Sequence, residues 1–159
     1  MKNQSTTSNP SLLLKNLSVV FFGLLLGMIM MGGIVYSMNP SENFEADLHN
    51  PFLAVMIIVS VAGVFGSNRL YAFFINKIKE DDPLGDKTAK IQQAIIVRLA
   101  LVEGPALVGI VLYLKEANLV FLMFSAFLIL YFLTLKPSKD KLLEDMKLTG
   151  MEKREFQNS

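Results

Sequence analysis

Apolar residues in this chain gather into four long segments separated by short polar stretches. No charged residue lies between Lys15 and Glu42. The stretch between Glu116 and Lys136 is also uncharged. A bilayer core of about 30 Å is crossed by roughly 20 apolar residues in a helix, so segments of this kind are long enough to span it. We therefore predict four membrane-spanning helices, over residues 17–38, 51–75, 91–114 and 119–135.

Local signals indicate where these helices begin and how they connect. Pro51 suits the first turn of the second helix, and Asp86 is a candidate N-cap for the third. Four residues, 115–118, separate the third helix from the fourth, and so short a connection requires antiparallel neighbours. The predicted fold is all-α: an integral membrane four-helix bundle made of two antiparallel hairpins.

Polar segments flank the predicted membrane domain, which covers residues 17–135. Residues 1–16 form a polar N-terminal arm. The alternative is a cleaved signal peptide, but the first apolar run is longer than the usual apolar core of about 7–15 residues. We therefore expect the first span to be retained.

The tail, residues 136–159, has an amphipathic pattern. Ser138 is expected to cap a short helix whose apolar side chains are Leu142, Leu143 and Met146. Thr149 then begins a stretch with capping-box spacing. This cytoplasmic amphipathic tail is expected either to lie along the membrane surface or to dock a cytoplasmic partner.

Basic residues are distributed unevenly between the two sides of the predicted bundle. Thirteen lie in the N-terminal arm, in the second connection with its flanks and in the tail, whereas the other side holds Lys115. Because cytoplasmic loops carry the excess of Lys and Arg, both termini are predicted to be cytoplasmic. The expected location is the bacterial cytoplasmic (inner) membrane, as a multi-pass protein.

Composition narrows the possible function classes. Of the 159 residues, 52% are hydrophobic and 18% are charged, whereas ordinary soluble domains are about 25% charged. The formal net charge of +1 provides no global field for nucleic acid. With no cysteine and one histidine, His49, we expect no metal site, no cofactor, no catalytic residue and no enzymatic activity. The expected partner is the lipid bilayer.

Polar side chains inside the predicted spans are costly in a bilayer and therefore mark candidate sites. Glu103 lies near the middle of the third span. Asn68, Arg69 and Arg98 share a level roughly 8–10 Å nearer the cytoplasm, at about 1.5 Å per residue. The two arginines can extend towards the headgroups, whereas Glu103 cannot. Glu103 must then be protonated or paired, with Arg69 and Ser125 as candidate partners.

Gly104 and Pro105 directly follow Glu103. Pro105 removes the backbone hydrogen bond to the Leu101 carbonyl, so a kink is predicted at this level. Broken helices near the midplane recur where transporters bind ions. Two interpretations stay open: Glu103 pins two helices together, or it forms an intramembrane proton or ion site.

Small residues predict where helices approach closely. Gly23 and Gly27 form a G-x-x-x-G pair in the first span, and the second span contains Gly63 and Ser67. We expect these residues to pack within one chain. The alternative is a seam between copies in a homo-oligomer.

The stretch Arg98–Gly109, with the sequence RLALVEGPALVG, resembles the carboxylate-bearing helix of the rotary ATP synthase proteolipid (c) subunit. The similarity lies in a mid-membrane Glu103 among small and apolar residues, and in the polar loop at residues 81–90. It implies that Glu103 is a proton-carrying carboxylate. The chain differs by placing this carboxylate on the third of four spans.

The chain also resembles a small, uncharacterised bacterial family of four-span membrane proteins. Arg98–Leu107 and the exit of the fourth span, Leu130–Lys139, carry this similarity. The family is loosely labelled transporter-like and has no assigned substrate, so the resemblance implies a fold more than a function.

Two functional hypotheses follow. The first is a non-enzymatic scaffold or accessory subunit of a membrane assembly, which works with a membrane-protein partner or as a homo-oligomer. The second is a small proton- or ion-coupled carrier or proteolipid-like component, in which Glu103 titrates.

Overall fold

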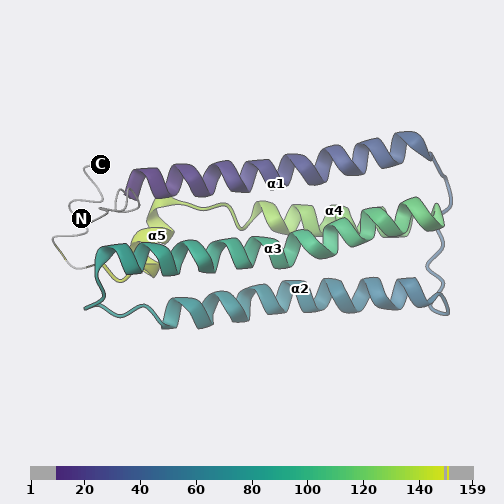
Figure 1. Ribbon diagram of the computed structural model, residues 1–159. Coiled ribbons are helices and arrows are strands. Elements are labelled where there is room, and N and C mark those ends of the chain that lie inside the picture. Colours follow the sequence, from purple (N-terminus) through teal and green to yellow (C-terminus); the bar gives the residue numbers. More distant parts are fainter. Residues whose placement is uncertain (1–9, 149, 151–159) are drawn as a thin grey trace, which may run out of the picture.

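The computed structural model describes residues 10–148 and 150 (Figure 1). Every regular element in this part of the chain is a helix, which confirms the predicted all-α class. The five helices, in chain order, are α1 (Pro10–Met38), α2 (Pro51–Asn76), α3 (Leu84–Glu116), α4 (Leu119–Leu133) and α5 (Lys139–Asp145).

Three of these helices are long and apolar enough to cross a membrane: α1 from Leu12, α2 and α3. With 15 residues, α4 is about 22 Å long, which is shorter than a bilayer core of about 30 Å. It ends at Leu133, and Thr134 is its C-cap, whereas the apolar pattern predicted a span to residue 135. The described part of the chain therefore contains three span-length helices and one shorter apolar helix.

Side-chain caps define several helix starts. The Asn50 side chain accepts a hydrogen bond from the Phe52 backbone N–H over 2.9 Å, and Pro51 occupies the first turn of α2 as predicted. In the same way, Asn118 accepts from the backbone N–H of Val120 over 3.0 Å and starts α4. The predicted start of the third helix was wrong.

Helix α3 begins at Leu84 after Pro83, about two turns before the predicted span at residue 91. Asp86 lies in its first turn and is not the N-cap. The polar residues after Pro83 can form helix because helix formation does not require an apolar face, only backbone hydrogen bonds and compatible side chains. Hydropathy alone therefore missed this part of α3.

Helix α3 lies between the others and makes the largest contacts, with α2, α4 and α1 (Figure 1). An added Cβ at Gly63 on α2 would lie 2.6 Å from the Leu101 carbonyl oxygen and 2.7 Å from Pro105 Cγ. At Gly109 on α3, a Cβ would lie 2.9 Å from the Phe121 carbonyl oxygen on α4. Because glycine has no side chain, α2 and α4 can pack closely on α3 at these two positions.

The connections lie at two opposite ends of the molecule (Figure 1). One end, which we call the basic end, holds the start of α1, the α2–α3 loop at residues 77–83, and residues 134–148 with α5. The other end holds the α1–α2 loop and the α3–α4 turn. There, Leu119 N–H donates to the Asn43 carbonyl over 2.8 Å, and the Asn118 amide donates to the Glu45 carbonyl over 2.8 Å.

Helix α5 confirms the short amphipathic helix predicted in the tail. Ser138 Oγ accepts from the Lys141 backbone N–H over 3.4 Å, and Leu142 and Met146 are buried. Lys147 Nζ donates to the Ile78 carbonyl over 3.1 Å, which joins the tail to the α2–α3 loop. The capping pattern predicted at Thr149 falls outside the described residues.

Candidate intramembrane polar site

A polar connection joins α2, α3 and α4 about one turn and a half below Glu103 on the side of the basic end. An Arg98 guanidinium N–H donates to the Asn68 side-chain oxygen over 2.8 Å. The Asn68 amide nitrogen in turn donates to the Tyr131 hydroxyl over 2.8 Å. The structure thus brings together Asn68 and Arg98, which the rise per residue had placed at one level.

Tyr71 extends this connection towards the tail. The Arg98 guanidinium carbon lies 4.5 Å from the centroid of the Tyr71 ring, a cation–π contact. The Tyr71 hydroxyl donates a hydrogen bond to the carboxylate of Asp145 on α5. Sequence reasoning missed both residues, although the three-residue spacing of Asn68 and Tyr71 places them on one face of α2.

Neither expected partner of Glu103 is paired with it. Arg69 is exposed and forms no hydrogen bond or ion pair with a residue that the structure describes. Ser125 Oγ is buried and donates to the Ala106 carbonyl over 2.8 Å. The predicted pin from Glu103 to Arg69 or Ser125 is therefore wrong in this structure. The reason is rotational: Arg69 lies next to Asn68, about 100° further round α2.

Glu103 lies at the edge of the buried face of α3. Its neighbours Val102, Pro105 and Ala106 are buried, whereas Ala100 and Gly104 are exposed, and Glu103 itself is half-buried. Within residues 10–148 it has no hydrogen-bond or ion-pair partner. The carboxylate therefore lies between the packed core and the open side of α3.

Pro105 lies inside a helix that continues from Leu84 to Glu116. Its ring faces α2 at Gly63, where the two helices approach closely. A Cβ built on Gly104 would meet nothing within 4 Å. Pro105 thus forms a tight helix contact, whereas Gly104, directly beside Glu103, is an open position.

The small residues divide into two groups. Gly63 and Ser67 are buried on α2, which confirms their predicted packing within the chain. Gly23 and Gly27 are exposed, and a Cβ at either would meet no atom within 4 Å. The prediction that the G-x-x-x-G pair packs within one chain is therefore wrong, because α1 contacts α3 and α4 through its opposite face, which carries Phe21, Leu25 and Met28.

Hydroxyl groups in the core form hydrogen bonds within their surroundings. Ser60 donates to the Met56 carbonyl over 2.7 Å, and Ser67 donates to the Val64 carbonyl over 2.8 Å. Grooves between α2 and α3 and between α1 and α4 are lined almost entirely by apolar and small residues. Among the described residues, no three His, Cys, Asp or Glu side chains could together hold a metal ion.

Comparison of the chain with protein-family models, with curated proteins and with solved structures finds no match. The resemblances noted from the sequence therefore stay expectations.

Proposed function

We propose that the chain is an integral membrane protein whose four helices α1–α4 all cross the bilayer, with the basic end in the cytoplasm. Three helices of span length and the uneven distribution of Lys and Arg support this placement. The shorter α4 packs against α3 and is followed by buried Leu135 and then Lys136. A short apolar helix is accommodated by local thinning of the bilayer and by flanking side chains that reach the interface.

Cysteine labelling tests this topology because the chain has no native cysteine. Asn43 and Glu80 are exposed and lie in the two opposite loop regions. In intact cells, Asn43→Cys should react with an impermeant thiol reagent, and Glu80→Cys should react only after permeabilisation. The reverse pattern would contradict the proposed orientation, and labelling of both in intact cells would contradict the spans between them.

Within the membrane, we propose a non-enzymatic role as a scaffold or accessory subunit of a membrane assembly. The observation that supports this role is the interior of the bundle. Its buried hydroxyls at Ser60, Ser67 and Ser125 all donate to backbone carbonyls, and the grooves between α2 and α3 and between α1 and α4 have apolar walls. Transporters bind substrates and ions at sites with polar groups left available near the midplane. An interior of this kind favours a structural role.

Crosslinking in native membranes tests the scaffold role. Ile29 is 52% exposed on α1, and its neighbour Met28 is 1% exposed. A photoreactive group on Ile29→Cys should capture other membrane proteins, whereas the same group on Met28→Cys should not. Mass measurement after purification in a gentle detergent should then show a hetero-complex. A monomer without crosslinks from Ile29→Cys would contradict the proposal.

A second candidate function is a proton-carrying component in which Glu103 titrates. One observation favours it: Glu103 has no partner among the described residues and lies beside the open position at Gly104. An unpaired carboxyl group in hydrocarbon is far cheaper to accommodate when it carries a proton. Such a group is reactive towards a hydrophobic carbodiimide, which attacks the protonated acid.

Carbodiimide labelling of purified membranes distinguishes the second candidate from the first. At neutral pH the reagent should modify Glu103, and Glu103→Gln should abolish the modification. Glu116→Gln, at the end of α3, is the matched control and should leave it unchanged. Absence of labelling at Glu103 would contradict a proton-carrying role and leave the scaffold role as the proposal.

A further inference from the structure

A small recess opens at the basic end, where α2, α3 and the residues after α4 meet α5. Its polar lining comprises Tyr71, Arg98, Lys136, Ser138 and Lys141. Its apolar lining includes Ile95, Leu99, Leu135 and Leu142. Segments far apart in the sequence thus form one cavity that has three positive charges and apolar walls. We call this cavity the basic recess.

The positive charges of the basic recess are not neutralised within the described chain. Arg98, Lys136 and Lys141 form no ion pair with a described carboxylate. Arg98 and Lys141 both lie against the Tyr71 ring, at 4.5 and 5.4 Å from its centroid. The carboxylate of Asp145, which contacts this lining, accepts a hydrogen bond from Tyr71. Glu144 on α5 also acts electrostatically on Tyr71, so two carboxylates lie near the three cations.

Arg98 retains unused donors beside this recess. One terminal N–H donates to Asn68, but Nε is buried and has no hydrogen-bond partner among the described residues. Nε is enclosed, so the donors left for an incoming acceptor are those of the terminal guanidinium nitrogen that does not bond Asn68. Guanidinium groups match the oxygen atoms of phosphate in charge and geometry, and lysines add point charges.

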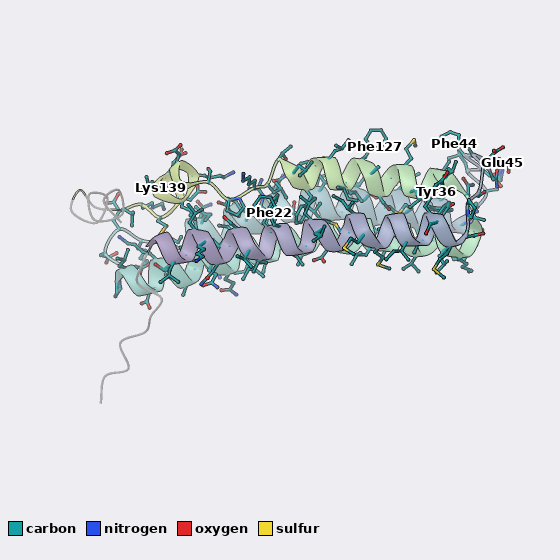
Figure 2. The ribbon with its side chains drawn as sticks, turned by 90° about the horizontal axis from the view of Figure 1, so that it is seen from above. Phe22, Tyr36, Phe44, Glu45, Phe127 and Lys139 are labelled. Carbon is teal, nitrogen blue, oxygen red and sulfur yellow. The ribbon has the colours of Figure 1, made fainter. Side chains whose placement is uncertain are left out.

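The position of the recess indicates the source of the phosphate. Lys136 directly follows Leu135, and its ammonium lies 5.4 Å from the Phe22 ring of α1. Figure 2 shows Lys139 beside α5 at this end, far from Phe44 and Glu45 at the other. In the proposed orientation this level is that of the cytoplasmic headgroups, where phosphate is present on lipids. Apolar side chains lie beside the cations, and a lipid carries apolar groups next to its phosphate whereas free phosphate does not.

We propose that the basic recess binds the phosphate group of an anionic phospholipid, held by Arg98, Lys136 and Lys141 with the Ser138 hydroxyl beside them. This inference rests on the proposed membrane placement, and it holds for either the scaffold or the proton-carrying role. The bound lipid would stabilise the docking of α5, because its cationic contacts join Arg98 on α3 to Lys136 in the α4–α5 connection and to Lys141 on α5.

A lipid titration of the purified full chain tests the proposal. Thermal unfolding in detergent micelles is followed by circular dichroism while phosphatidylglycerol, phosphatidylcholine or inorganic phosphate is added. Phosphatidylglycerol should raise the unfolding temperature, and the other two should not. In the double variant Lys136→Gln and Lys141→Gln, the phosphatidylglycerol concentration required should rise by about tenfold or more.

Two single variants serve as matched controls. Lys77→Gln removes a charge at the same end outside the recess, where Lys77 lies 4.0 Å from the Phe73 ring. Lys115→Gln removes a charge at the opposite end. Both should keep the response to phosphatidylglycerol. If the double variant has less helix than the wild type, the exposed Lys141→Gln substitution alone provides the test, with a smaller expected shift.

Several outcomes would overturn the proposal. Equal protection by phosphatidylcholine would show that charge is not recognised, and equal protection by inorganic phosphate would assign the recess to a soluble anion. An equal loss in Lys77→Gln would show a diffuse electrostatic effect. Extraction of the chain from membranes by alkaline carbonate would refute the membrane placement separately, since the micelle titration does not depend on it.

Discussion

Arg98 on α3 and Asn68 on α2 are joined by a hydrogen bond of 2.8 Å, donated by the arginine to the asparagine side-chain oxygen. The amide nitrogen of Asn68 then donates to Tyr131 on α4. An arginine within a helix that enters the membrane is costly unless its donors are satisfied. A single neutral side chain on α2 therefore helps to hold the charge on α3 and connects three helices.

Substitution of Asn68 should weaken this connection. Asn68→Leu removes an acceptor from Arg98 and a donor to Tyr131, and we expect a loss of about 1–2 kcal/mol in unfolding free energy. The control is Asn76→Leu at the end of α2, where the side chain is exposed and should tolerate the change. Thermal unfolding in detergent provides the measurement. An equal loss in the two variants would refute a specific role for Asn68.

Glycine substitutions should separate packed from open positions. Gly63→Ala places a Cβ within 2.6 Å of the Leu101 carbonyl oxygen, and we expect a cost of about 1–3 kcal/mol from overpacking. Gly23→Ala meets no atom within 4 Å and should be neutral or stabilising by up to about 1 kcal/mol, because alanine favours helix. Thermal unfolding in detergent compares the two. A large loss for Gly23→Ala would place that position in a contact with a second molecule.

Removal of the Tyr71 hydroxyl should release α5 from the bundle. Tyr71→Phe keeps the ring contact with Arg98 and deletes the hydrogen bond to Asp145. Because hydrogen bonds to charged groups contribute more than neutral ones, we expect tryptic cleavage after Lys139 or Lys141 to accelerate by about tenfold. Tyr36→Phe, on an exposed residue of α1, is the control. Unchanged cleavage in Tyr71→Phe would show that the hydrogen bond to Asp145 does not hold α5.

The α2–α3 loop should respond to pH through Asp82. Its carboxylate accepts from the Lys79 backbone N–H over 2.9 Å and from Lys90 Nζ over 2.6 Å. These hydrogen bonds hold the pKa of Asp82 below its ordinary value. A lowered pKa in the folded state means that the stabilisation is present above the ordinary pKa and is lost as pH falls through the lowered value.

Hydrogen exchange in residues 77–83 measures this effect. At neutral pH, Asp82→Asn should exchange faster than the wild type, and the difference should disappear as pH falls below the ordinary aspartate range. Asp81→Asn, at the neighbouring exposed position, should behave like the wild type throughout. A difference between Asp82→Asn and the wild type that persists at low pH would rule out the carboxylate as its cause.

Local residues account for much of the fold. The apolar runs predicted α1, α2 and the apolar part of α3. A long apolar run indicates a span-length helix from residue type alone, whether its side chains are buried or exposed in the folded chain. Asn50 with Pro51 determined the start of α2 through a cap that involves two residues in sequence. The early start of α3 after Pro83 escaped prediction because its first turns are polar and leave no trace in hydropathy.

The candidate site depended both on local sequence and on how the helices pack. The rise per residue was sufficient to place Asn68 and Arg98 at one height, and their hydrogen bond agrees with it. Pairing of Glu103 could not be predicted in this way, because it depends on which face each helix turns towards its neighbour. That rotation follows from the close approach of Gly63 to Pro105, which is a contact between residues 42 positions apart in the sequence.

The amino-acid sequence by itself determined the helical class, the span-length helices, the amphipathic tail and the accumulation of basic residues at one end. These properties depend on composition and on neighbours along the chain, so they are present before any helix packs. Only the tertiary structure decided that Gly63 rather than Gly23 lies in a contact, that Glu103 pairs with neither Arg69 nor Ser125, and that Arg98, Lys136 and Lys141 share one recess. Each of these depends on the relative rotation and depth of separate helices, which side-chain packing sets once the chain has folded.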